Sequence, residues 1–217
     1  MDAYLDHDFI ETPEGFLFCV VGCVHPKDRV LAYLKYVPDT SGKWGRGQRR
    51  FRRTMLTYSI PQVLGNIEML KTSYPQYVFN SRILNITMSA VPRRLIKEHF
   101  KPRKRLRQLL LSSAKDDLEK DAVDLVDELS NESAVDRSSF GITGSVLTGI
   151  HNVNFSDIDI TVYGLDNGTR VMNAVKSRFE DASSDIKPLH GALYSRTVKR
   201  WTQNYGFSIE EAKSPWR

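Results

Sequence analysis

The chain has 217 residues, of which 41% are hydrophobic and 26% are charged, which is typical of a globular protein and excludes a disordered chain, a coiled coil or a fibrous repeat. No apolar run reaches about 18 residues, so the sequence predicts no membrane span and no membrane partner. The acidic start, MDAYLDHDF, lacks the basic region of a secretory signal. Cys19 and Cys23 share one apolar run, and we expect them to be reduced, buried thiols of a cytoplasmic protein.

Positive charge is concentrated in the first half of the chain. Residues 1–111 hold 19 Lys and Arg against 9 Asp and Glu, whereas residues 112–217 hold 12 against 17. This asymmetry indicates two units with different surfaces, so we expect a basic N-terminal α/β domain over 1–111 and a second domain over 112–217. The basic half suits a nucleic acid, and an ordinary solvated basic surface is the alternative.

The first predicted elements form an antiparallel hairpin. Two runs rich in β-branched and aromatic residues, 16–24 and 30–37, are separated by a short segment with a proline and an aspartate. Strand alternation places the odd-numbered residues of the second run, Lys35 among them, on one face. The even-numbered residues, including Tyr36, are then expected on the other face.

A basic segment with three glycines follows the hairpin, over 41–57. It contains six Lys and Arg residues with no acid between them, and two aromatic residues interleave with the charges. Cations and aromatic rings together suit contacts with the phosphates and bases of a nucleic acid. The alternative is a flexible loop that leads into a strand with a solvated face. The candidate nucleic-acid contacts are Arg49, Arg50, Arg52 and Arg53.

The remaining N-terminal elements follow from proline positions and apolar spacing. A helix is predicted over 61–73, starting at Pro61, and two strands over 77–79 and 83–90. A second helical stretch begins at Pro92 and is broken or kinked at Pro102, and a further helix is predicted over 117–130.

The segment from 140 to 164 carries the candidate chemistry. A short apolar strand ends at Gly144-Ser145, the next residues start a helix, and a second strand is predicted over 156–164. In that strand Asp157 and Asp159 are two residues apart, so both carboxylates are expected on one face. Two neighbouring carboxylates repel each other unless a cation lies between them, and oxygen ligands on a rigid strand suit Mg²⁺ or Mn²⁺.

Gly144-Ser145 complements the two carboxylates. Glycine allows a phosphate to approach the backbone closely, and the start of a helix offers free N–H groups. The serine hydroxyl adds one hydrogen-bond donor. Together with the carboxylates, this arrangement suits metal-assisted phosphoryl or nucleotidyl transfer.

This segment resembles the nucleotidyltransferase domain of the DNA polymerase β superfamily. Thr143-Gly144-Ser145 is followed, after eleven residues, by Asp157-Ile158-Asp159, and Ser156 and the run 160–164 also look like minimal members of that superfamily. The whole chain is similar to a group of predicted archaeal nucleotidyltransferases with an extra N-terminal region.

The resemblance implies an α+β fold, with a short mixed sheet flanked by helices in the second domain. It further implies that Asp157 and Asp159 bridge two Mg²⁺ ions, one activating an acceptor hydroxyl and one holding the triphosphate of an NTP. Attack on the α-phosphorus would release pyrophosphate. The implied nucleotide-binding residues are Gly144, Ser145 and Ser156.

The superfamily also supplies a third carboxylate from the next core strand. The best candidate here is Asp185, at the start of a predicted strand over 185–189 that Pro188 weakens. His151 lies between the two halves of the motif, and we expect a solvated loop histidine there rather than a nucleotide contact.

The leading hypothesis is a cytoplasmic, Mg²⁺- or Mn²⁺-dependent nucleotidyltransferase. It would move a nucleoside monophosphate from an NTP to a hydroxyl of a nucleic acid, a protein or a small molecule. The alternative is a non-catalytic nucleic-acid-binding protein with a degenerate domain, or an antitoxin-like regulator with a stable protein partner. The third carboxylate distinguishes these hypotheses, because its loss would leave a relic of the enzyme.

Overall fold

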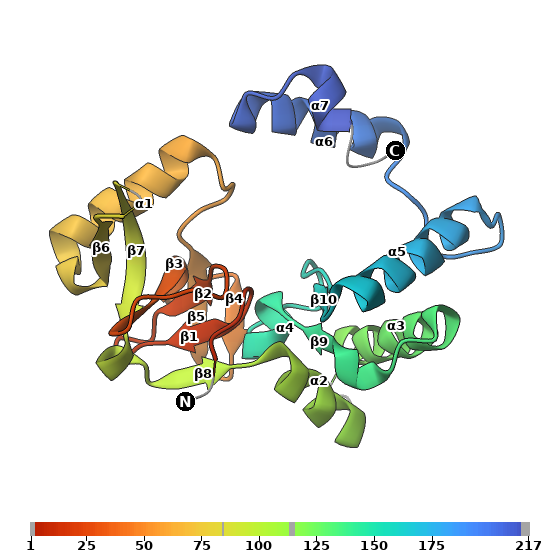
Figure 1. The fold of residues 1–217 in the computed structure, drawn as a ribbon, viewed down its shortest axis with the longest axis horizontal. Helices are drawn as coiled ribbons and strands as arrows, with labels where there is room; N and C mark the ends of the chain where they lie inside the picture. Colours follow the sequence, from red (N-terminus) through yellow and green to blue (C-terminus); the bar gives the residue numbers. More distant parts are fainter. Residues whose placement is uncertain (1–2, 84, 113–115, 214–217) are drawn as a thin grey trace.

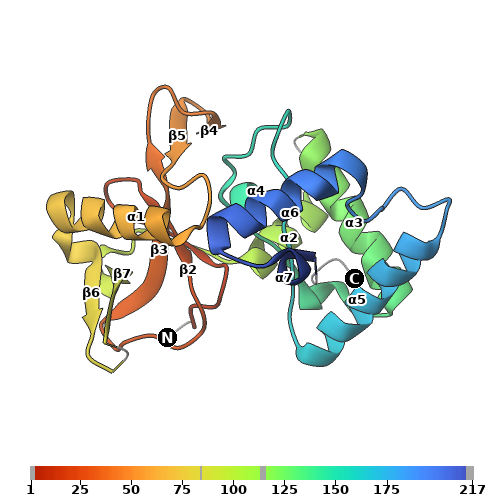
Figure 2. The same ribbon diagram turned by 90° about the horizontal axis from the view of Figure 1, so that it is seen from above.

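The structure is a computed structural model that describes residues 3–83, 85–112 and 116–213. The fold is mixed α+β, as predicted. Figures 1 and 2 show an N-terminal unit built mainly of strands beside a C-terminal unit built mainly of helices. Among the described residues, every helix is too short or too polar to cross a membrane.

Eight antiparallel strands form the N-terminal sheet, in the order β4-β5-β3-β2-β1-β8, with β7 also paired to β3 and β6 paired to β7. Their bounds are β1 Phe9–Glu11, β2 Leu17–Val20, β3 Arg29–Pro38, β4 Trp44–Arg46, β5 Arg49–Arg53, β6 Val78–Ser81, β7 Ile86–Pro92 and β8 Glu98–Phe100. The predicted hairpin is confirmed, because β2 and β3 pair antiparallel.

One face of this sheet is covered by α1 (Ile60–Ser73) and a 3-10 turn (Pro75–Tyr77). Leu70 of α1 and Tyr77 of the turn pack in a first core with residues of β2 and β3. In Figure 1, α1 lies along β6 and β7, and contacts join the three elements. The helix predicted to start at Pro61 is therefore confirmed, and its apolar side faces this core.

The C-terminal unit contains six helices and two strands among its described residues. They are α2 Pro102–Leu111, α3 Asp117–Ser133, β9 Phe140–Ile142, α4 Gly144–Thr148, β10 Ile160–Val162, α5 Leu165–Glu180, α6 Gly191–Tyr205 and α7 Ile209–Lys213, with a 3-10 turn at Arg137–Ser139. A further 3-10 turn, Arg93–Leu95, lies between β7 and β8 of the N-terminal sheet. β9 and β10 form a two-stranded antiparallel sheet in place of the expected mixed sheet.

A second core joins α2, α3, β9, α4 and α5. Leu106 and Leu109 of α2 pack there beside Val126 of α3 and Phe140 of β9. Helix α2 therefore packs with the C-terminal unit although it precedes the expected boundary between 111 and 112. That boundary adjoins residues 113–115, which lie outside the described residues.

A third core connects the two units. Phe9, Tyr36 and Phe51 of the N-terminal sheet pack with Leu147 and Ile150, which follow β9 in the C-terminal unit. A main-chain hydrogen bond from Gly45 N to the Ile150 carbonyl, 2.9 Å long, joins β4 to the same segment. The N-terminal sheet therefore packs directly against the segment that follows β9 in the motif.

A β-bulge interrupts the pairing of β2 and β3. Leu17 lies opposite Tyr36, whereas the next residue, Phe18, lies opposite Leu34, so Lys35 is an extra residue on β3. The strict alternation predicted from the sequence is wrong beyond this point. Tyr36 packs in the third core, and Val37 packs against the first core together with Leu34.

Two further predicted elements differ from the structure. The stretch after Pro92 forms a short 3-10 turn and then β8 in place of the predicted helix, because β8 pairs with β1 and supplies hydrogen-bond partners to the buried backbone of that strand. The strand predicted over 185–189 is absent: this segment is irregular and contains Pro188, which has no N–H for a sheet. Of the two cysteines expected to be buried, Cys23 is exposed.

Candidate functional site

The two halves of the motif meet at Gly144 and Asp159. Thr143 N donates a hydrogen bond of 2.9 Å to the Asp159 carbonyl, which aligns the residues before β10 with the end of β9. Gly144 has a positive φ of 67°, and a Cβ atom at this position would overlap the Asp159 carboxylate. Glycine is therefore required here both for the backbone conformation and for the close approach of Asp159.

Asp157 and Asp159, which we call the aspartate pair, lie in the extended segment just before β10 rather than inside the predicted long strand. Asp157 is exposed and Asp159 is half-buried. Burial raises the pKa of Asp159, and the negative charge of Asp157 raises it further. A nearby cation would relieve both effects.

Three basic groups of the N-terminal unit influence the pKa of Asp159. The charges of Lys35 on β3, Arg53 on β5 and His7 oppose the rise in the pKa of Asp159. In Figure 1, α4 and β10 lie on the side of the C-terminal unit that faces the N-terminal strands. Sequence reasoning did not find Lys35 or His7, because neither belongs to a motif and only the packing of the two units brings them to the aspartate pair.

His7 occupies an unusual backbone position beside the motif. Its φ is 66°, in the left-handed region, and its carbonyl accepts a 2.7 Å hydrogen bond from Thr143 Oγ1. The ring Nδ1 lies 3.0 Å from the Asp6 carboxylate, which also accepts a 2.7 Å hydrogen bond from Gly22 N. The N-terminal turn is thus attached to the motif through Thr143.

The two serines of the motif have different surroundings. Ser145 is buried with Gly144 in α4, which leaves little of either residue exposed to a ligand. Ser156 closes a turn: its Oγ accepts a 2.9 Å hydrogen bond from Asn152 N, and its own N donates to the Asn152 carbonyl at 2.8 Å. This turn fixes the chain immediately before Asp157.

Among the described residues, Asp185 forms no cluster of possible metal ligands with the aspartate pair. It lines a cavity of about 810 Å³ together with Ile158 and with acidic residues of α3. Asp157 and Asp159 are not among the residues that line this cavity. Ile158 itself packs on the second core.

His151 belongs to a second cluster, with Asp116 and Glu119, whose ligand-type atoms lie within 4.8 Å of one another. Its side chain is only 7% exposed, so the expectation of a solvated histidine is wrong. Asp116 caps α3 by accepting from Glu119 N at 3.0 Å and lies 2.8 Å from His151 Nε2. Glu119 pairs with Arg105, so existing partners already offset both carboxylates. Helix capping explains the position of Asp116, whereas Nδ1 of His151 is buried without a hydrogen-bond partner among the described residues.

Three of the four candidate arginines in the basic segment already form side-chain contacts with other residues of the protein. Arg49 pairs with the buried Glu11 at 3.1 Å, and Arg52 pairs with Asp39 at 2.9 Å. Arg53 donates from Nε to Tyr36 Oη at 3.3 Å. Within the described residues, Arg50 is the member of the four whose side chain forms no hydrogen bond or ion pair, although its carbonyl accepts from Asp39 N at 2.9 Å.

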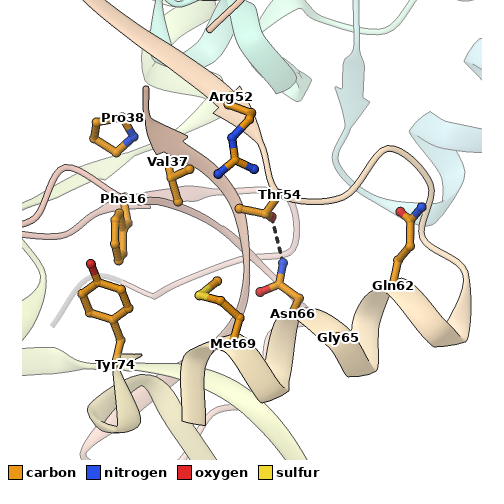
Figure 3. Close-up of a pocket in the computed structure, with 10 residues that line it drawn as sticks. All are labelled: Phe16, Val37, Pro38, Arg52, Thr54, Gln62, Gly65, Asn66, Met69 and Tyr74. Carbon is orange, nitrogen blue, oxygen red and sulfur yellow. Dashed lines mark hydrogen bonds between the residues drawn. The ribbon is translucent and has the colours of Figure 1, made fainter. Parts of the chain in front are cut away.

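A cavity of about 520 Å³ lies elsewhere, between β3, β5 and α1 (Figure 3). Asn66 of α1 projects toward Thr54 and donates a 2.8 Å hydrogen bond to its Oγ1, while Phe16 and Tyr74 form an apolar side. No residue of the motif lines this cavity.

Comparison with known proteins finds one uncharacterized archaeal relative, MJ1086 of Methanocaldococcus jannaschii. It is 29% identical to this chain over 206 residues, which are 94% of this chain and 60% of MJ1086. The chain therefore spans less than two thirds of the length of that relative. No family model and no solved structure matches the chain.

Proposed function

We propose that the protein is a metal-dependent nucleotidyltransferase of the DNA polymerase β type, which moves a nucleoside monophosphate from an NTP to an acceptor hydroxyl and releases pyrophosphate. The observation that carries this proposal is the contact of the Asp159 carboxylate with Gly144, beside Asp157. Two sequence segments that resemble the halves of one signature lie against each other.

The aspartate pair has the donor chemistry of a site for Mg²⁺ or Mn²⁺. One residue separates its two carboxylates along the chain, and the raised pKa of Asp159 reflects burial and repulsion that a divalent cation would relieve. When bound, such an ion supplies charge stabilisation at the phosphates and lowers the pKa of a hydroxyl.

The chain's own residues have distinct tasks in this proposal. The aspartate pair holds the metal ion, and Gly144 leaves the space that the Asp159 carboxylate occupies. The Thr143 N–H fixes the backbone of Asp159, and the turn closed by Ser156 fixes the chain before Asp157. Fixed carboxylates reduce the reorganisation needed when charge develops on the phosphates.

A second candidate function is supported by the position of Asp185. Among the described residues, Asp185 forms no metal-ligand cluster with the aspartate pair, and it lines a cavity with Ile158 and acidic residues of α3. In this second proposal the domain binds a metal ion and a nucleotide but does not transfer the nucleotide. The basic N-terminal half would then bind nucleic acid.

Transfer is tested with each of the four α-labelled NTPs, Mg²⁺ and a pool of total RNA, by measuring incorporated label and released pyrophosphate. We expect metal-dependent incorporation that Asp157→Asn and Asp159→Asn abolish, whereas Asp185→Asn retains it. Incorporation that is equal in all three variants contradicts the proposed site. Binding of the Mg²⁺–NTP complex without incorporation or pyrophosphate release supports the second candidate.

A further inference from the structure

Two cations of the N-terminal sheet lie where it packs against the motif, and neither forms an ion pair among the described residues. Lys35 and Arg53 are both half-buried. Lys35 lies on Phe9 of the third core, which also holds Leu147 of α4, and Arg53 lies on Trp44, whose ring contacts Phe155 of the loop before Asp157. Within the described residues, neither cation forms an ion pair with a carboxylate, although other basic residues of the same sheet do. Half-buried positive charges without a carboxylate partner are costly unless another group compensates them.

Aromatic rings hold both cations in place. The Lys35 ammonium lies 5.4 Å from the ring centroid of Phe9 and 5.9 Å from that of Tyr58. Ring contacts of this kind attract a cation but leave its charge and most of its donors available to an anion.

Arg53 is held in the same manner, and its position depends on both units. Its guanidinium lies 5.1 Å from the ring centroid of Trp44 and 5.7 Å from that of Tyr36. Trp44 makes an edge contact of 5.4 Å with Phe155, which belongs to the loop between the two halves of the motif. Asn152 Nδ2 of the same loop donates to the Lys43 carbonyl at 3.4 Å.

The β-bulge places Tyr36 on the same face of β3 as Lys35. Lys35 is the extra residue of β3, and its neighbours Tyr33 and Tyr36 both pack in the third core, which faces the C-terminal unit. Strict alternation already puts Lys35 on the face of Tyr33, and the extra residue adds Tyr36 to that face. Bulges commonly redirect a side chain beside a functional site.

We propose that Lys35 and Arg53 bind the phosphates of a nucleoside triphosphate whose divalent metal ion the aspartate pair holds. This inference rests on the proposed function and assigns part of the nucleotide site to the N-terminal unit. Carboxylates and cations have complementary tasks, because the metal ion needs oxygen ligands and the triphosphate needs positive hydrogen-bond donors. The complete nucleotide site then exists only where the two units pack together.

The test separates metal binding from phosphate binding. Binding of Mn²⁺ alone is measured by electron paramagnetic resonance, and binding of tripolyphosphate with Mg²⁺ by calorimetry. The variants are Lys35→Met and Arg53→Gln. Their controls are Lys71→Met, at an exposed lysine of α1, and Arg29→Gln, at an arginine 5.2 Å from the Phe79 ring that pairs with Asp28.

We expect each test variant to weaken tripolyphosphate binding by about tenfold or more, since one charged hydrogen bond is worth about that factor. Affinity for Mn²⁺ stays equal or increases, because a repelling charge is removed. The controls keep wild-type affinity for both probes. Lys35→Arg and Arg53→Lys keep the charge and are expected to retain most of the binding, which separates loss of charge from loss of folding.

Tripolyphosphate affinity within twofold of wild type in both test variants would overturn the inference and leave the two cations as charge compensation for the aspartate pair. Equal losses in Lys35→Met and Lys35→Arg would also overturn it. If the wild-type protein binds Mn²⁺ but no tripolyphosphate, the inference fails while the metal site stands. If it does not bind Mn²⁺, the proposed function itself fails.

Discussion

Replacing Gly144 by alanine tests the contact on which the candidate site depends. A Cβ at a φ of 67° carries the cost of the left-handed conformation, about 1–2 kcal/mol. The same atom would overlap the Asp159 carboxylate and force that side chain from its position, at about 0.5–1.5 kcal/mol. We therefore expect Gly144→Ala to lower the free energy of unfolding by about 2–3 kcal/mol, or the melting temperature by about 4–12 °C.

The chain offers a matched control. Gly149 has a φ of 66° and would place a Cβ where nothing lies within 4 Å, so Gly149→Ala carries the conformational cost alone. Urea unfolding of both variants is expected to show the larger loss for Gly144→Ala, and only that variant should lose affinity for Mn²⁺. In an Asp159→Ala background the difference should disappear. Equal losses in the two variants, with Mn²⁺ binding intact in both, would refute the contact between Gly144 and Asp159.

Three other predictions concern titratable groups. Burial and the neighbouring Asp157 raise the pKa of Asp159, so the stability that Asp159 contributes is present below its unfolded pKa and is lost as pH rises through its folded pKa. Asp159→Asn should therefore raise the urea midpoint of unfolding at pH 7 in chelator. A lower midpoint than that of the wild type contradicts this. Burial alone would raise the pKa of Glu11, but its two basic partners, Arg49 and Lys97, lower it. The stability that Glu11 contributes is therefore lost as pH falls below about 4.5, so Glu11→Gln should lower the free energy of unfolding by about 1–2 kcal/mol at pH 7 and by much less in acid. An equal cost at both pH values contradicts the pairing. Burial raises the pKa of Cys19 to about 11, so a thiol reagent at pH 8 should label Cys23 in the native protein and Cys19 only after unfolding, and rapid native labelling of both contradicts the burial of Cys19.

Local patterns in the sequence predicted the elements that depend on nearby residues. The hairpin of β2 and β3, the helix after Pro61 and the short strand before Gly144 all follow from apolar spacing and proline positions. The meeting of Gly144 with Asp159 also agrees with the expected strand–helix–strand unit, because β10 returns antiparallel to β9.

The rest depends on contacts between distant parts of the chain. The pairing of β8 with β1 overrides the helical spacing after Pro92, since the buried edge of β1 requires hydrogen-bond partners. The bulge at Lys35 arises from the register of two strands and has no signature in either one. His151 is buried because Asp116, 35 residues away, binds it at the start of α3. None of these features has a local sequence signal.

The most direct test of a metal-dependent triphosphate site is the melting temperature of the protein with each NTP, in Mg²⁺, in Mn²⁺ and in chelator. A ligand at about 100 times its Kd adds about 2.7 kcal/mol to the native state, which corresponds to a rise of about 5–11 °C for a chain of this length. We predict that rise with metal only, its loss in Asp157→Asn, and its retention in Asp185→Asn, whose carboxylate lines the cavity beside α3. No shift with any NTP, or an equal shift in chelator and in Asp157→Asn, would contradict a metal-dependent nucleotide site at Asp157 and Asp159.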